Sequence, residues 1–137
     1  INTPKLVYID DYAHHPEELR ATIESLRGIF PGRRLLAIFQ PHLYTRTRDF
    51  AAEFSEVLSL CDEVIMVPIY PARELPMNGI TSEVLINKIK SASKVLLDKA
   101  ELVSFLTQNT PEVLLIIGAG DIGEMVDEIK LALEKNN

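Results

Sequence analysis

Apolar and polar positions form alternating blocks along the chain, and five of these blocks are short, almost unbroken apolar runs. The runs cover residues 6–9, 35–39, 63–67, 94–97 and 113–117. Strands that are buried on both faces of a parallel sheet have this continuous apolar pattern, whereas strands with one solvated face alternate apolar and polar side chains. The pattern therefore predicts five strands of a mainly parallel sheet.

Between the runs, apolar residues recur every three or four positions, which is the spacing of a helix with one buried face. The first such stretch contains Leu19, Ile23, Leu26 and Phe30, and Pro16 suits its first turn. Similar stretches cover residues 50–58, 81–89, 98–106 and 121–134. This alternation of strands and helices predicts an α/β fold, with an open, mainly parallel sheet and helices on both faces.

Local signals mark the starts of two later helices and one long loop. Thr81 or Ser82 can cap the third helix, and Asp98 and Glu101 have capping-box spacing before the fourth. Residues 68–79 contain three prolines and read as one irregular loop. A loop of this length in a compact domain is usually functional or mobile.

The composition limits what the protein can do. Its 137 residues suffice for one domain with a buried core, and a net charge of −6 argues against a general nucleic-acid-binding surface. No apolar run approaches the roughly eighteen residues needed for membrane insertion. The single cysteine, Cys61, excludes an internal disulfide and a cysteine-cluster zinc site. Because the chain begins at Ile1 and enters a strand almost at once, we expect a domain cut from a longer protein, with processing of a precursor as the alternative.

The densest cluster of polar side chains follows the first strand directly and precedes the first helix. It contains Asp10, Asp11, Tyr12, His14 and His15. The carboxyl ends of parallel strands meet at one edge of the sheet, where open α/β proteins bind ligands. So many polar groups would each need a partner if they served stability alone, and the cluster therefore predicts a functional site.

Two further strands deliver polar residues to the same edge. The second leads to His42 and Arg46, with Arg48 close behind, and the third leads to the long loop that holds Arg73 and Glu74. Three arginines near this edge of an acidic protein suit a carboxylate or phosphate ligand, which arginine binds with two parallel hydrogen bonds.

The fifth strand ends in a glycine-rich turn at residues 118–123, which fits the G-x-G-x-x-G dinucleotide pattern. A true dinucleotide fingerprint also needs a second strand and an acidic residue about twenty positions later, and the chain ends too soon for both. We therefore expect no nicotinamide or flavin here. The turn either packs tightly for structural reasons or lets its backbone amides contact part of a ligand.

Metal binding is an alternative use of the first cluster, because carboxylates and imidazoles are metal ligands. Adjacent histidines in one turn rarely point the same way, however, and His42 stands alone on another loop. The chain also lacks a Gly-x-x-x-x-Gly-Lys-Ser/Thr loop and a Gly-x-Ser-x-Gly nucleophile motif. It therefore has no triphosphate cradle of its own.

Residues 10–18 resemble the opening motif of the C-terminal domain of the Mur ligases, and residues 39–49, 69–74 and 118–122 extend the resemblance in order along the chain. The resemblance implies that residues 1–137 are a single Rossmann-like domain, the third of a three-domain cytoplasmic enzyme of peptidoglycan synthesis. It implies that the full enzyme uses ATP with Mg²⁺, mainly through its central domain, to join L-alanine to UDP-N-acetylmuramate through an acyl phosphate. The fragment alone should then be inactive.

The resemblance also implies roles for individual residues. Asp11 matches a residue that approaches the ATP ribose, and His15 is placed on the ATP side with it. The residues implied on the L-alanine side are Tyr12, His14, His42, Arg46, Arg73, Ala119 and Gly120. Arg46 matches the residue that holds the amino-acid carboxylate, but Leu43 stands where many relatives have a second arginine, for which Arg48 or Arg73 could compensate. No catalytic residue and no metal ligand is implied in this domain alone.

Three alternatives remain open at this point. A related recycling ligase attaches a peptide instead of L-alanine, although its second loop lacks the His-x-Tyr-Thr-Arg-Thr pattern of this chain. The chain could also be a stand-alone nucleotide- or amino-acid-binding module. The third alternative is a metal-dependent hydrolase that uses Asp10, Asp11, His14 and His15.

Overall fold

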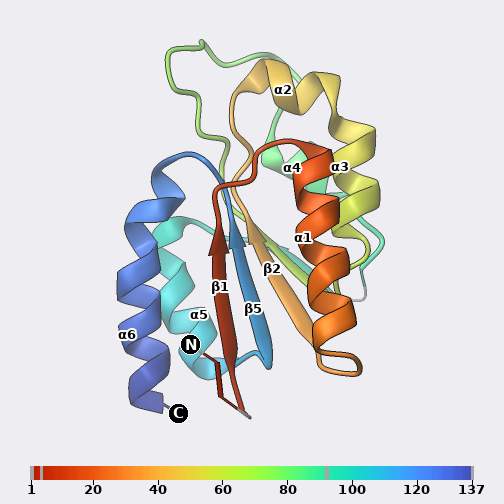
Figure 1. Ribbon diagram of the computed structural model, residues 1–137. Helices are drawn as coiled ribbons and strands as arrows, with labels where there is room; N and C mark the ends of the chain where they lie inside the picture. Colours follow the sequence, from red (N-terminus) through yellow and green to blue (C-terminus); the bar gives the residue numbers. More distant parts are fainter. Residues whose placement is uncertain (1, 4, 92, 137) are drawn as a thin grey trace.

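The computed structural model describes residues 2–3, 5–91 and 93–136. Its centre is a parallel sheet in the order β1-β5-β2-β3-β4 (Figure 1). The strands are β1 Val7–Asp11, β2 Leu35–Phe39, β3 Glu63–Met66, β4 Ser93–Leu96 and β5 Val113–Ile117. The α/β fold with a parallel sheet, predicted from the apolar runs, is confirmed.

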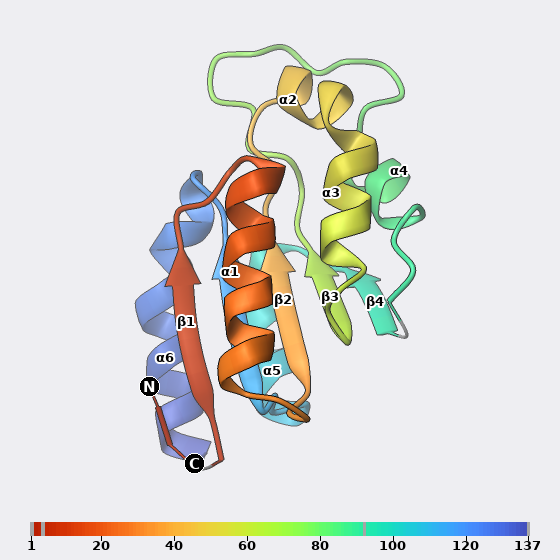
Figure 2. The same ribbon diagram turned by 45° about the vertical axis from the view of Figure 1, so that its right-hand side comes forward.

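Helices cover both faces of the sheet, as Figures 1 and 2 show. The α-helices are α1 Pro16–Ile29, α2 Tyr44–Asp49, α3 Ala51–Leu58, α4 Ser82–Ile86, α5 Leu102–Gln108 and α6 Val126–Asn136, and the 3₁₀ turns are η1 Lys99–Glu101 and η2 Asp121–Met125. In the described part of the chain, no helix combines the length and apolarity that a membrane span requires.

Two apolar cores lie on the two faces of the sheet, because successive side chains of a strand point in opposite directions. Ala37 and Phe39 of β2 pack in the core beneath α1, α3 and α4, whereas Leu36 and Ile38 pack beneath α5, η2 and α6. All five side chains of β2 and all five of β5 are buried. This double coverage explains why both strands read as unbroken apolar runs.

The order of the strands creates a natural ligand crevice. Strand β5 lies between β1 and β2. The chain leaves β1 and β2 towards helices on one face and leaves β5 towards α6 on the other face (Figure 2). At such a switch point the loops after the strands separate and leave a crevice at the carboxyl edge of the sheet. The loop of residues 68–79 arches over α2 at this same edge (Figure 1).

Several boundaries differ from the sequence-based prediction; α4, for example, ends at Ile86 and not at Ile89. Strand β1 runs to Asp11 rather than ending at Ile9, and Asp10 and Asp11 pair with the end of β5. An edge strand tolerates this because it has only one neighbour and can turn polar side chains to solvent. The second helical region is split, with α2 preceding α3. The last helix begins as the 3₁₀ turn η2 instead of a regular α-helix.

The predicted helix starts agree with the structure. The Thr81 hydroxyl oxygen accepts a hydrogen bond from the backbone N–H of Val84 at 3.2 Å, which caps α4. The Glu101 carboxylate accepts one from the backbone N–H of Asp98 at 3.0 Å, as its capping-box spacing predicts.

Candidate functional site

The loop after β1 is shaped by its own side chains. The Asp11 carboxylate accepts hydrogen bonds from the backbone N–H of Ala13, at 3.0 Å, and from the hydroxyl of Thr22 on α1. These bonds fix the start of the loop, in which Tyr12 is 72% exposed. His15 follows as the N-cap residue of α1, and the Glu18 carboxylate accepts from its backbone N–H at 3.1 Å.

The loop after β2 is held in an unusual conformation before α2. Leu43 has φ 71° and ψ 140°, a region that favours glycine. Its N–H donates to the carbonyl of Tyr70 at 2.8 Å, and its own carbonyl accepts from the hydroxyl of Thr47 at 2.8 Å. Such strain persists only where the surrounding structure fixes the chain on both sides, as it does here.

Helix α2 begins with a cap from a distant residue. The Glu74 carboxylate accepts hydrogen bonds from the backbone N–H of Thr45, at 3.0 Å, and from the Thr45 hydroxyl. These bonds, the hydroxyl first, hold the pKa of Glu74 below its ordinary value. The loop of residues 68–79 is therefore fastened to α2.

Rings from three loops meet beside this helix. The ring centroids of Tyr12 and His14 are 6.1 Å apart, and those of His14 and His42 are 6.0 Å apart. The His42 ring in turn stacks on Tyr70, with centroids 5.6 Å apart and an interplanar angle of 14°. The structure thus brings Tyr12, His14 and His42 together, as their positions after parallel strands predict.

Arg46 belongs to the same group. Its Nη1 lies 2.9 Å from Nδ1 of His42. Burial, followed by the charges of Arg46 and His14, lowers the pKa of His42, and the Glu74 carboxylate opposes this only in part. Within the described chain, no carboxylate lies within 4 Å of Arg46. A guanidinium whose charge is not neutralised by the protein suits an anionic ligand.

The turn after β5 packs closely against Tyr70 and Gln40. A Cβ atom on Gly120 would lie 2.5 Å from Cγ of Tyr70 and 2.7 Å from Oε1 of Gln40. Only glycine allows so close an approach, which is the structural alternative predicted for this turn. Ala119 lies in the same turn, which also borders a small cavity of about 80 Å³ together with Asp10 and Asp11.

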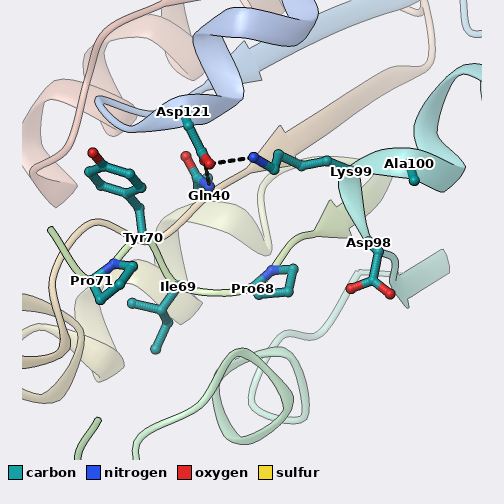
Figure 3. Close-up of a pocket in the computed structure, with 9 residues that line it drawn as sticks. All are labelled: Gln40, Pro68, Ile69, Tyr70, Pro71, Asp98, Lys99, Ala100 and Asp121. Carbon is teal, nitrogen blue, oxygen red and sulfur yellow. Dashed lines mark hydrogen bonds and ion pairs between the residues drawn. The ribbon is translucent and has the colours of Figure 1, made fainter. Parts of the chain in front are cut away.

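Behind Tyr70 lies a larger cavity of about 330 Å³, lined by the nine residues that Figure 3 draws as sticks. Buried Gln40 spans its floor, donating from Nε2 to the Asp121 carboxylate at 2.6 Å and accepting from the Ile122 N–H at 3.0 Å. Lys99 forms an ion pair with Asp121. Burial raises the pKa of Asp121, but the hydrogen bonds from Lys99 and Gln40 outweigh it and the net direction is downward.

Some predicted residues lie apart from the group. Arg73 is exposed in its loop. Arg48 forms an exposed ion pair with its neighbour Asp49 at 2.9 Å. Whether Arg48 or Arg73 compensates for the second arginine, which is a leucine at position 43 in this chain, stays a prediction. The His15 ring lies against Phe50, at 5.7 Å between centroids, and 5.1 Å from His14.

A metal site finds no support in the geometry. Among residues 2–3, 5–91 and 93–136, no three His, Cys, Asp or Glu side chains are arranged to hold an ion. The Asp11 oxygens are engaged by Ala13 and Thr22, and the His14 Nδ1 lies 3.3 Å from the Tyr12 carbonyl.

Sequence reasoning missed three residues that shape the site. Tyr70 lies in the long loop of residues 68–79, and its ring stacks on His42. Gln40 and Lys99 anchor Asp121 across 81 and 22 positions of the sequence. Gln40 could have been found, because it follows β2 directly at the edge where ligand-binding residues are expected.

Comparisons with known proteins identify the family of the chain. Residues 1–120 match the family described as "Mur ligase, glutamate ligase domain". A UDP-N-acetylmuramate–L-alanine ligase from Flavobacterium johnsoniae is 52% identical over 136 residues, which are 99% of this chain and 30% of the relative. The chain thus spans about 30% of the length of the curated relatives it matches.

Solved structures show the same fold. The crystal structure of the UDP-N-acetylmuramate–alanine ligase from Thermotoga maritima is 24% identical, with a TM-score of 0.76 over 98% of this chain and 28% of that one. The MurF ligase from Thermotoga maritima, in complex with ADP, is 20% identical, with a TM-score of 0.63 over 100% of this chain and 31% of that one. The fold, the polar edge and the family match lead to one conclusion: this chain belongs to the Mur ligase family, as its glutamate ligase domain.

Proposed function

We propose that this chain is the C-terminal domain of a three-domain, cytoplasmic, ATP-dependent ligase that joins L-alanine to UDP-N-acetylmuramate in peptidoglycan synthesis. In this reaction the muramate carboxylate is phosphorylated by ATP, the amine of L-alanine attacks the acyl phosphate, and a tetrahedral intermediate expels phosphate. The relative that is 52% identical along nearly the whole chain carries this activity in its name, which favours L-alanine over a peptide as the incoming group.

The observation that carries the proposal is the unneutralised Arg46 among Tyr12, His14 and His42. Its planar guanidinium can donate two parallel hydrogen bonds to the carboxylate of an amino acid. A carboxylate fixed in this way leaves the amine free to face the acyl phosphate. Holding two reactants in such an arrangement lowers the entropic part of the barrier.

We expect the site beside Arg46 to accept a small amino acid. The rings of His14, His42 and Tyr70 stand close together beside the guanidinium. We therefore expect alanine, glycine and serine to be used ahead of larger amino acids. Discrimination by one methylene is worth only about 1–3 kcal/mol, so some glycine and serine would be incorporated.

Fewer contacts in the structure support the proposed ATP-binding roles of Asp11 and His15. Each oxygen of the Asp11 carboxylate is used once by the protein and retains a lone pair, so it can still accept from a ribose hydroxyl. His15 lies next to it at the start of α1. ATP supplies the phosphoryl group when bound, and we assign its Mg²⁺ chiefly to the central domain, as the resemblance to the family implies.

The proposal predicts a specific kinetic effect of Arg46→Ala in the full-length ligase. The KM for L-alanine should rise about a hundredfold, the loss expected for a paired, charge-assisted contact, while the KM for ATP changes little. Arg27→Ala is the matched control, because Arg27 forms its ion pair with Asp62, at the opposite end of the sheet. Equal effects of Arg46→Ala on the two KM values would contradict the assignment.

A second measurement separates the ligase domain from a self-sufficient binding module. Calorimetry of the isolated chain with ATP and with L-alanine should show weak binding at most, and the isolated chain should not form the amide. Tight binding of either ligand would favour the module.

A further inference from the structure

We propose that His42 and Tyr70 are positioning residues for Arg46, and that His42 does this as a neutral hydrogen-bond acceptor braced by the Tyr70 ring. The inference deepens the proposed function and rests on it, because it explains how the residue assigned to the amino-acid carboxylate is held. It assigns Tyr70 a role that the sequence did not suggest. It also makes His42 a support for the binding group instead of a ligand contact.

The direction of the hydrogen bond between the two side chains follows from their chemistry. A guanidinium has five N–H donors and no acceptor. The Nδ1 atom of His42, 2.9 Å from Nη1 of Arg46, must therefore accept with its lone pair. The ring proton then resides on Nε2 and the ring is neutral. A protonated imidazole would turn an N–H towards the N–H groups of Arg46 and lose the bond.

The surroundings favour the neutral ring. The charged or titratable groups that face His42 are Arg46 on α2, His14 from the loop after β1, and Glu74 and Tyr70 from the loop of residues 68–79. Partial burial and the two basic neighbours lower the pKa of His42, and only Glu74 acts in the opposite sense.

Tyr70 is itself fixed from three sides. Its backbone N–H donates to the carbonyl of Pro41 at 2.8 Å, and its carbonyl accepts from Leu43 at 2.8 Å. The two bonds flank His42 in the chain and form a one-residue parallel bridge between His42 and Tyr70. The Tyr70 ring occupies the space that Gly120 leaves open, since a Cβ there would lie 2.5 Å away from it.

This support has a particular advantage over an ion pair. A carboxylate in the place of His42 would orient Arg46 equally well but would also neutralise its charge. A neutral imidazole fixes the guanidinium and leaves the charge for the ligand. Arg46 is thus aimed before the amino acid arrives, which lowers the cost of ordering a long side chain on binding.

The test compares two substitutions of His42 in the full-length ligase. His42→Phe keeps a flat ring against Tyr70 but has no acceptor, and His42→Asn loses the ring but can place its Oδ1 near the position of Nδ1. We expect His42→Phe to raise the KM for L-alanine about tenfold, as the loss of one hydrogen bond to a charged group predicts, with the KM for ATP within about twofold of the parent. In His42→Asn, the KM for L-alanine should be much closer to that of the parent than it is in His42→Phe.

The pH profile supplies a readout that a purely structural role would not change. In the parent, kcat/KM for L-alanine should fall at acid pH as His42 takes up a proton. This fall of kcat/KM at acid pH should be missing in His42→Asn, because its amide does not titrate. His14 and both substrates are the same in the two enzymes, so they cannot account for the difference. An acid limb that is unchanged in His42→Asn overturns the proposal.

Tyr70 is tested in parallel. Tyr70→Leu, which removes the flat ring, should raise the KM for L-alanine about threefold, and Tyr70→Phe should raise it less. A KM for L-alanine in His42→Phe equal to that of the parent contradicts the inference. If Arg46→Ala raises the KM for L-alanine and His42→Phe does not, the positioning role of His42 is wrong and the proposed function stands. If the KM for L-alanine is unchanged in Arg46→Ala, the proposed function itself is contradicted.

Discussion

Arg27 and Arg34, at the amino-terminal end of the parallel sheet, have a different environment from Arg46 at the carboxyl-terminal end. At the amino-terminal end, Arg27 pairs with Asp62 at 3.0 Å, and Arg34 pairs with Glu63. At the carboxyl-terminal end, Arg46 bonds the imidazole of His42, and neither Arg46 nor Arg73 has an acidic partner among the described residues. The charges of Arg27 and Arg34 are thus paired within the protein, whereas the charge of Arg46 remains available to a ligand.

Backbone strain is divided in the same way. Among the described residues other than glycine, only Leu43 and Ala72 have positive φ, at 71° and 53°. Both lie in loops at the carboxyl-terminal end. Strained residues persist where function requires a particular geometry and the surrounding contacts can sustain it. Charge and strain thus distinguish the same end of the sheet.

Among the substitutions that test the difference between the two ends of the sheet, Gly120→Ala should have the largest effect on stability. The new Cβ would press on Tyr70 and Gln40, which should cost about 1–3 kcal/mol of unfolding free energy and raise the KM for L-alanine in the full-length ligase. Gly123→Ala, three positions on, is the matched control because nothing lies within 4 Å of its Cβ position. Equal losses in the two variants, measured by urea unfolding, would show that the close packing at Gly120 has no special role.

A substitution at the amino-terminal end of the sheet should change the stability of the protein and leave the binding of L-alanine unchanged. The Asp62 carboxylate accepts from the backbone N–H of Leu35 at 2.8 Å as well as pairing with Arg27. Asp62→Ala should therefore lower the unfolding free energy by about 1–2 kcal/mol and leave the KM for L-alanine unchanged. A rise in that KM comparable with the effect of Arg46→Ala would erase the distinction between the two ends.

The pH dependence of the same residue follows from its contacts. Burial raises the pKa of Asp62, but the hydrogen bonds from Arg27 and Leu35 outweigh it and hold the pKa below its ordinary value. The carboxylate therefore contributes stability above about pH 4, and this is lost as the pH falls through the folded-state pKa. Asp62→Asn keeps an acceptor for Leu35 and loses the charge, so its deficit relative to the parent should shrink on going from pH 7 to pH 3. A deficit that is constant across this range would contradict the charge-based explanation.

The smallest effect is expected for Ala72→Gly. Glycine relieves the strain of a positive φ at Ala72 but gains freedom in the unfolded chain, so the net stabilisation should be at most about 1 kcal/mol. Thermal unfolding measures it. A loss of stability would mean that the contacts of the Ala72 methyl group and the lower freedom of alanine in the unfolded chain stabilise the protein more than the positive φ destabilises it.

Much of the fold was predictable because burial on both faces of the sheet leaves an unbroken apolar run, as in β2 and β5. Helix α2 was not predictable, since its sequence lacks apolar periodicity and its cap comes from Glu74, 29 residues away. The last two residues of β1 were missed because an edge strand can continue with polar side chains. Contacts between distant residues decide these cases, and a single sequence does not display them.

For the site, topology made the main prediction possible. Residues that follow parallel strands must meet at one edge, and Tyr12, His14, His42 and Arg46 do so. The partnership of His42 with Tyr70 could not be read from the sequence, because it depends on a backbone bridge between two loops. Nor could the sequence show that Arg48 is paired with its neighbour while Arg46 is not neutralised by the protein.

The claim that Arg46 binds the carboxylate of the incoming amino acid is tested most directly by comparing L-alanine with L-alaninamide, which lacks that carboxylate. In the parent full-length ligase, kcat/KM should favour L-alanine by about a hundredfold, as expected for a charge-assisted pair. In Arg46→Ala the preference should almost disappear, because neither substrate then finds the guanidinium. A preference that survives Arg46→Ala undiminished would show that the carboxylate is bound elsewhere.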